Sequence, residues 1–137
     1  MPNVMWLDRL EEKDIEECGV KAMRVGDLLR KSVNTVPGFV VTHEAYEKFL
    51  EDNNLQAPIM DMAEEFESMG LDELKSFRRN LSDNLSEGAI PWDLEIEILN
   101  ALKQSGFGYP LVIRPSYYLD NSSDVTLDED GTEQEGE

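Results

Sequence analysis

Hydrophobic side chains along this sequence recur mostly three or four residues apart, which is the spacing of amphipathic helices. Two short runs break this pattern, because their apolar residues follow one another without interruption and favour β-strands. The predicted helices lie within residues 17–31, 43–53, 58–69, 72–88 and 91–102, and the predicted strands lie near 38–42 and 110–114.

The clearest local signal is a turn, a strand and a helix in direct succession. A Val-Pro-Gly turn at 36–38 precedes a β-rich run that ends at Thr42. Thr42 suits the N-cap of a helix beginning at His43, because its hydroxyl can accept a hydrogen bond from a free backbone N–H. Val41 and Tyr46 have the spacing of a hydrophobic staple across this start. The sequence therefore predicts that the strand passes straight into the helix.

The fold class follows from the balance of these elements. The Leu-Val-Ile run within 110–114 predicts a buried strand, since an uninterrupted apolar run suits a strand covered on both faces. Five helices and two short strands indicate an α+β fold, mainly helical with a small sheet. A length of 137 residues suits one domain. We place this domain at residues 1–118.

Charge separates the end of the chain from its body. The sequence has 12 Lys and Arg against 30 Asp and Glu, a formal net charge of −18. Residues 119–137 hold eight acids and neither Lys nor Arg, so 1–118 carries −10. We expect 119–137 to be a disordered acidic tail. Because the body is acidic too, it would repel phosphate backbones and anionic lipid, so we expect neither a nucleic-acid nor a membrane partner.

The sequence contains few indications of a cellular compartment or of metal binding. Cys18 is the single cysteine, which favours a reducing compartment. No signal-type or membrane-spanning apolar run develops, so we expect a cytoplasmic protein. The acidic stretch 126–137 imitates a calcium loop, but it starts with Thr126 and has Glu133 where an apolar residue belongs. The sequence therefore predicts no metal site, and it offers no catalytic residue.

Two cations stand where they could bind an anion. Lys21 follows Gly19-Val20 at a predicted loop-to-helix junction, where free N–H groups and the helix dipole attract anions. The alternative is an ordinary solvated lysine. Arg114 ends the predicted strand 110–114, where a guanidinium needs a partner. That partner is either a phosphate bound in bidentate fashion or an acid in a structural salt bridge.

These residues fall within a longer likeness to one protein family. Residues 18–29 (CGVKAMRVGDLL) resemble the GGK-x-x-NLGEL segment of phosphoenolpyruvate synthase and pyruvate phosphate dikinase. Residues 36–46 (VPGFVVTHEAY) are similar to the family's PPGFVVTTEAY segment, the most specific of these matches. The helices at 58–102 resemble its helical insert, and 111–116 falls where the family has VRSSA. The resemblance spans roughly residues 15–118.

The resemblance implies a fold and a ligand. In this family the segment begins an ATP-grasp nucleotide-binding domain, whose GGK lysine and VRSSA arginine contact ATP phosphates. The matching positions are Lys21 and Arg114, and Gly19 and Ser116 belong to the same two motifs. These four residues are therefore the expected nucleotide-binding residues, with ATP and Mg²⁺ as the ligand. The full enzymes phosphorylate a histidine and then pyruvate, giving phosphoenolpyruvate.

The sequence also departs from the family pattern. Val20 replaces the second glycine of GGK, Arg24 stands at the asparagine position, and residues 113–117 read IRPSY where the family has VRSSA. The second half of the nucleotide-binding domain, the histidine domain and the barrel have no counterpart here. We therefore expect a subdomain that is inactive alone, with the remaining parts of a split enzyme as partners. The alternative is a non-catalytic interaction module that kept the fold and lost the chemistry.

A second, shorter likeness concerns the same arginine. Residues 108–117 (GYPLVIRPSY) look like the GYPLVVRPSYVLGG strand of carbamoyl-phosphate synthetase, another ATP-grasp enzyme. The likeness covers about ten residues and lacks the glycine pair that follows. It supports a phosphate-facing Arg114 and does not imply that enzyme's activity.

Overall fold

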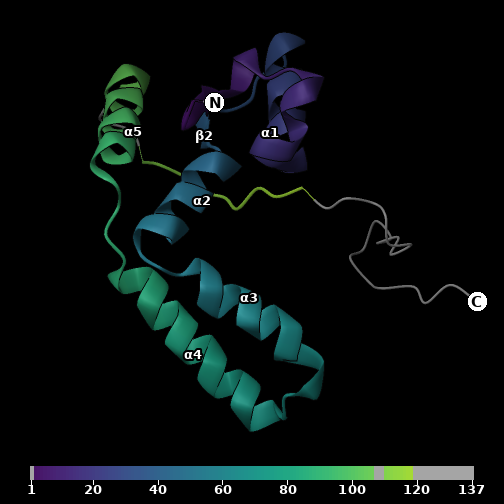
Figure 1. Cartoon of the computed structure of the whole chain (residues 1–137). Helices are drawn as coiled ribbons and strands as arrows, with labels where there is room; N and C mark the ends of the chain where they lie inside the picture. Colours follow the sequence, from purple (N-terminus) through teal and green to yellow (C-terminus); the bar gives the residue numbers. More distant parts are fainter. Residues whose placement is uncertain (1, 107–109, 119–137) are drawn as a thin grey trace, which may run out of the picture.

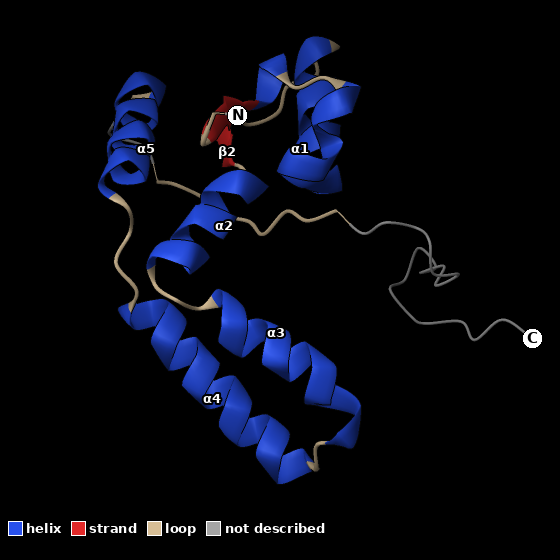
Figure 2. Ribbon diagram, viewed as in Figure 1, coloured by secondary structure: helices blue, strands red, loops and turns tan. Residues whose placement is uncertain are grey.

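The computed structural model describes residues 2–106 and 110–118 (Figure 1). Helices dominate it, and two short strands form a small antiparallel sheet (Figure 2). This composition confirms the predicted α+β class. The elements in chain order are β1 (Val4–Trp6), η1 (Leu7–Arg9), η2 (Glu12–Asp14), α1 (Ile15–Arg30), β2 (Phe39–Val41), α2 (His43–Asp52), α3 (Gln56–Glu65), η3 (Phe66–Ser68), α4 (Leu71–Glu87) and α5 (Trp92–Ser105), where η denotes a 3₁₀ helix.

The sheet differs from the prediction in one of its two strands. β2 confirms the strand near 38–42, but its partner is β1, which the sequence analysis missed. The central pair of the register is Met5 opposite Val40, and the rings of Trp6 and Phe39 meet edge to face, 5.8 Å apart. β1 has only three residues, too few for an alternating pattern to identify it.

The predicted strand at 110–114 is wrong for the chain as the structure describes it. The described segment from Pro110 to Tyr118 has no regular secondary structure. Leu111, Val112 and Ile113 are 63%, 72% and 92% exposed. A strand forms only against another strand that pairs its backbone, and the described residues supply none beside this segment.

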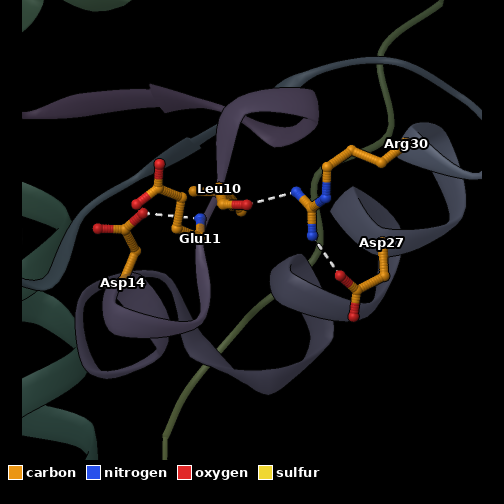
Figure 3. Close-up of polar contacts among 5 residues, drawn as sticks. All are labelled: Leu10, Glu11, Asp14, Asp27 and Arg30. Atoms are coloured by element: carbon orange, nitrogen blue, oxygen red, sulfur yellow. Dashed lines mark hydrogen bonds and ion pairs between the residues drawn. The ribbon is translucent and has the colours of Figure 1, made fainter.

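The main core lies between α1 and the segment that precedes it. Leu10, Cys18, Ala22 and Met23 are buried together, and apolar side chains of β1, β2 and η1 pack against them. Figure 3 shows how polar groups fix this segment to α1: the Arg30 guanidinium donates to the carbonyl of Leu10 and to Asp27. Nearby, the Glu11 N–H donates to the buried Asp14 carboxylate over 2.8 Å (Figure 3).

Helix α2 begins as the sequence predicts. The Thr42 hydroxyl accepts from the Ala45 N–H over 3.3 Å, so Thr42 is the N-cap. The same hydroxyl donates to the carbonyl of Pro2 over 3.1 Å, which ties the start of α2 to the beginning of the chain. Thr42 is buried, and both functions of its hydroxyl are satisfied.

Helices α3 and α4 form a hairpin that extends away from the rest of the molecule (Figure 1). Neither helix buries a residue fully, and the predicted apolar stripe of α4 is half-buried at Leu74, Phe77, Leu81 and Leu85. The base of the hairpin is closed by the Asn53 amide. Its oxygen accepts from the Ala89 N–H over 2.8 Å, and its nitrogen donates to the Ala89 carbonyl over 2.9 Å.

Helix α5 returns the chain to the sheet. Its buried residues are Leu94 and Ala101, and the Asn3 amide beside β1 donates to Glu97 over 2.9 Å. In the described part of the chain, no helix is long and apolar enough to cross a membrane. The predicted acidic tail, 119–137, lies outside the described residues, and the predicted domain boundary stays a prediction.

Candidate functional site

The candidate site is built on a break inside α1. Gly19 has φ 79° and ψ 161°, a backbone conformation that is almost restricted to glycine. The helical hydrogen-bond ladder cannot run through such a residue, so a second helical stretch begins at Val20. The sequence pattern predicts a loop-to-helix junction at Gly19, whereas the structure places this residue between two helical stretches. In both cases the first N–H groups after Gly19 need partners from outside the helix.

Ser116 and Tyr117 supply those partners. The Ser116 hydroxyl accepts from the Ala22 N–H over 3.1 Å and donates to the carbonyl of Cys18 over 2.7 Å, so it spans the break. The Tyr117 carbonyl accepts from the Val20 N–H over 3.2 Å. Figure 1 shows the segment after α5, in yellow-green, running toward α1. We call these three hydrogen bonds the Ser116 latch.

Gly19 is required for this close approach as well as for its φ angle. A Cβ atom at position 19 would lie 2.5 Å from the Ser116 Oγ and 2.5 Å from the Tyr117 backbone nitrogen. Real Cβ contacts are not that short, so no larger residue fits without moving the segment. The structure therefore brings two of the predicted nucleotide-binding residues, Gly19 and Ser116, into contact with each other.

The two predicted cations are close in sequence to residues of the latch. Lys21 is exposed between Val20 and Ala22, whose N–H groups the latch uses. Arg114 is exposed three residues before Tyr117, so its Cα lies within about 10 Å of the Tyr117 Cα. The latch thus brings the backbones of Lys21 and Arg114, which are far apart in sequence, into one neighbourhood.

Both cations are free of protein partners among the residues described. Among these residues, no ion pair or hydrogen bond involves the side chain of Lys21 or Arg114, so both interpretations of Arg114 stay predictions. Exposed cations without a carboxylate partner keep their hydrogen-bonding capacity for an anion.

The Cys18 thiol lies directly beneath the break. It is buried and donates to the Gly19 carbonyl over 3.6 Å. Burial raises the pKa of the Cys18 thiol, and the negative charge of Asp14 raises this pKa further. The thiol is therefore protonated at neutral pH and acts as a small apolar side chain of the core.

One hollow in the described surface lies away from the break in α1. It has a volume of about 540 Å³, and its lining includes Asp8, Glu11, Asp27 and Arg30. Asp27 and Arg30 are at the opposite end of α1 from Gly19, at least 12 Å along the helix axis by the rise of about 1.5 Å per residue. Acids outnumber bases in this lining, so it suits an anion poorly. No group of three or more potential metal ligands occurs among residues 2–106 and 110–118.

These features define a helix-rich α+β unit in which a broken helix is bonded to a returning segment, with an exposed lysine and an exposed arginine close by in sequence. The chain belongs to a known family. Residues 15–127 match the family described as "pyruvate phosphate dikinase, AMP/ATP-binding domain". This match confirms the family predicted from the motifs, and it relates the chain to nucleotide-binding domains.

Curated relatives agree with this assignment. The chain is 32% identical over 104 residues to the probable phosphoenolpyruvate synthase of Methanothermobacter thermautotrophicus. The aligned region covers 74% of this chain and 15% of that protein. It is 33% identical over 99 residues to the phosphoenolpyruvate synthase of Aquifex aeolicus, covering 67% and 11% respectively. The probable phosphoenolpyruvate synthase of Methanocaldococcus jannaschii is 28% identical over 101 residues, covering 74% and 8%. The chain thus spans 15% or less of the length of these relatives.

Proposed function

We propose that this chain is the first part of an ATP-grasp nucleotide-binding domain from a phosphoenolpyruvate synthase-related phosphotransferase. In this proposal it contacts the phosphates of ATP with Lys21 and Arg114. The observation that carries the proposal is the Ser116 latch, because it holds the Arg114 segment against the helix that bears Lys21. The family match and the absence of protein partners for both cations in the described chain support it.

The two cations have different tasks. The Lys21 ammonium is a compact charge on a flexible stem, which can follow a phosphate group. The Arg114 guanidinium is planar and can bind two phosphate oxygens at once. Two backbone N–H groups at the helix break already bond to Ser116 and Tyr117. In this proposal the side chains of Lys21 and Arg114 therefore bind the phosphates. Since the chain has a net charge of −18, Mg²⁺ bound to the nucleotide would reduce the repulsion.

The chain alone would not transfer a phosphoryl group. That reaction needs metal-held phosphates and a positioned acceptor, and the described residues offer one lysine, one arginine and no acidic metal cluster at this place. We propose that the remaining parts of a phosphoenolpyruvate synthase-like enzyme complete the site. Relatives that are several times longer than this chain support that view.

The direct test is a titration of the ¹⁵N-labelled chain with ATP and magnesium. Amide shifts at Gly19–Met23 and at Arg114 are expected, and Lys21→Met or Arg114→Leu should each weaken the apparent affinity by about tenfold, as loss of one charge-assisted contact predicts. Lys103→Met, an exposed charge on α5, is the matched control and should leave the affinity unchanged. Absence of any shift at millimolar ATP would overturn nucleotide binding by this chain.

A second measurement addresses activity. With ATP and pyruvate the chain should produce no phosphoenolpyruvate above background, and sustained production would contradict the proposed incomplete site.

A non-catalytic interaction module is the second candidate. It is favoured by the use of the Val20 and Ala22 N–H groups inside the chain, because these are groups that a phosphate-binding helix start would otherwise offer. In this case the chain should bind a partner unrelated to phosphoenolpyruvate synthases, and this partner should bind Lys21→Met and Arg114→Leu chains equally well. Loss of partner binding in either variant would count against the module.

A further inference from the structure

Helix α5 carries apolar side chains on two opposite faces. Its inner face, which includes Leu94 and Ala101, is buried, and α5 contacts β1. On the other face, Trp92, Ile96 and Leu99 are 75%, 38% and 40% exposed. These three residues follow one another at steps of four and three, so they lie on one stripe of the helix. We call them the Trp92 stripe.

The described chain leaves the Trp92 stripe open to solvent. Figure 1 shows α5 at the edge of the molecule. Ile90, just before α5, is 53% exposed and extends the apolar surface toward the start of the helix. Single exposed apolar residues, such as Met60 on α3, are common on protein surfaces. A row of large apolar side chains at helical spacing is instead typical of a surface that binds another molecule.

The form of the stripe indicates a helical partner. It runs along two turns of α5, about 10 Å by the rise of about 1.5 Å per residue. Apolar anchors separated by four and three residues are the pattern with which amphipathic helices bind one another. A partner strand would need an unpaired backbone edge, and the interior of an α-helix has none. Trp92 is also the type of side chain that most often dominates the binding energy of an interface.

Charge indicates which kind of helix fits. Asp93 and Glu95 lie on opposite sides of the Trp92 stripe by helical geometry, and the whole chain has a net charge of −18. Asp93 also pairs with Lys48 of α2. A negative field of this size attracts a basic partner and accelerates its encounter with the surface. Exposed ion pairs add little affinity, so the apolar stripe has to supply most of it.

A second copy of the chain fits this surface less well. Because the stripe has an acid on each side, two α5 helices packed on one another would bring acids against acids in either orientation. The charge of −18 on each chain adds further repulsion. An anionic membrane surface is repelled for the same reason.

We propose that the Trp92 stripe is a docking surface for a basic amphipathic helix of another polypeptide chain. The Trp92 ring is the main anchor, and Ile96 and Leu99 continue the contact along α5. Lys or Arg side chains beside the partner's apolar face approach Asp93 and Glu95. This proposal is independent of the proposed nucleotide binding.

The test is a titration of the ¹⁵N-labelled full chain with a synthetic peptide of two LKKLLKL repeats, which forms a basic amphipathic helix. The indole N–H signal of Trp92 is expected to shift. The signal of Trp6, whose ring packs against Phe39, should stay in place. A control peptide with serine in place of leucine keeps the charge and should bind at least about tenfold more weakly. Equal binding of the two peptides, or no shift of the Trp92 signal, would overturn the proposal.

Substitutions in the chain supply the matched comparison. Trp92→Ser should weaken peptide binding by at least about tenfold, as expected for an anchor. Its circular dichroism spectrum should still show the folded helices, because the Trp92 side chain is mostly exposed. Met60→Ser is the control, since Met60 is 61% exposed on α3, and it should keep the affinity. Unchanged binding in Trp92→Ser, or equal losses in both variants, would contradict docking at this stripe.

Two further measurements distinguish the other occupants. Analytical ultracentrifugation should give a monomer, and a dimer that Trp92→Ser dissociates would assign the stripe to a second copy. Vesicles of neutral phosphatidylcholine should leave the tryptophan fluorescence unchanged. A blue shift that Trp92→Ser removes would assign the stripe to a lipid surface. Either of these two results would overturn the proposal.

Discussion

The two ends of the segment 110–118 behave differently although they are a few residues apart. Ser116 and Tyr117 are polar or amphipathic and are bonded to the break in α1, while Leu111, Val112 and Ile113 are aliphatic and exposed. Hydrophobicity alone would predict the opposite arrangement. The difference teaches that this segment takes its position from backbone groups at the helix break that need partners, and not from burial of its apolar side chains.

The largest change in stability is expected from adding a side chain at Gly19, where the latch leaves no room for one. Gly19→Ala should lower the free energy of unfolding by about 2–4 kcal/mol, because a residue with a side chain is strained at this φ and ψ and its Cβ collides with the latch. Urea denaturation measures the change. Gly70→Ala is the matched control, since nothing lies within 4 Å of a Cβ there, and as the replacement of an N-cap glycine it should cost no more than about 1 kcal/mol. Equal losses of stability in the two variants would contradict a special requirement for glycine at position 19.

Removing the Ser116 hydroxyl should lower the stability by a smaller amount. Ser116→Ala removes two hydrogen bonds at the break and should cost about 1–2 kcal/mol, with faster amide exchange at Ala22. Ser105→Ala is the control, because the Ser105 hydroxyl donates to the Ala101 carbonyl, within the preceding turn of α5. Its cost should stay within about 0.5 kcal/mol. Unchanged exchange at Ala22 in Ser116→Ala would show that the latch does not form in solution.

Alkaline pH should lower the free energy of unfolding through the buried Cys18 thiol. Because burial raises the pKa of this thiol in the folded chain, the folded state holds the proton more tightly than the unfolded one. The resulting stabilisation is complete below the pKa of an unfolded thiol, about 8.5, and is lost as the pH rises through the folded pKa. Unfolding curves between pH 7 and 10 should show this decline. Cys18→Ala should remove that part of the decline, and an identical pH profile in the variant would contradict the assignment.

The exposed aliphatic residues Leu111, Val112 and Ile113 should contribute least to the stability of the isolated chain. Ile113→Ser should change the free energy of unfolding by less than about 0.5 kcal/mol, because its side chain is 92% exposed. Leu55→Ala, at a buried position between α2 and α3, should cost about 2–5 kcal/mol in the same measurement. A large loss at Ile113 would mean that the chain itself covers this segment.

Local features of the fold could be predicted from the sequence, because their causes are local. The Thr42 cap and the stripe of α4 each depend on residues within one or two turns of one another. β1 could not be found, since a three-residue strand is defined by the partner it pairs with. The strand at 110–114 failed for a related reason: an apolar run becomes a strand only beside another strand, and the described residues place none next to it.

For the site, the sequence motifs identify the residues but not their arrangement. Lys21 and Arg114 follow from motifs, and their roles stay predictions. The bond between Ser116 and Ala22 joins residues 94 positions apart, and no local pattern encodes such a contact. A weak signal existed in the glycine at 19, because a glycine at a helix junction often marks the close approach of another backbone.

The Asn53 amide has a consequence for how this chain can vary. By pairing with both backbone groups of Ala89, it holds together the two ends of an excursion of 35 residues, 54–88, at a single point. Closing a loop costs little more when the loop is longer, so the hairpin within this excursion can be shortened or extended with small penalty as long as its base stays shut and the buried Leu55 is kept. The α3–α4 hairpin is therefore the natural position for insertions, affinity tags or sensor modules, whereas Asn53, Leu55 and Ala89 are residues that such engineering has to retain.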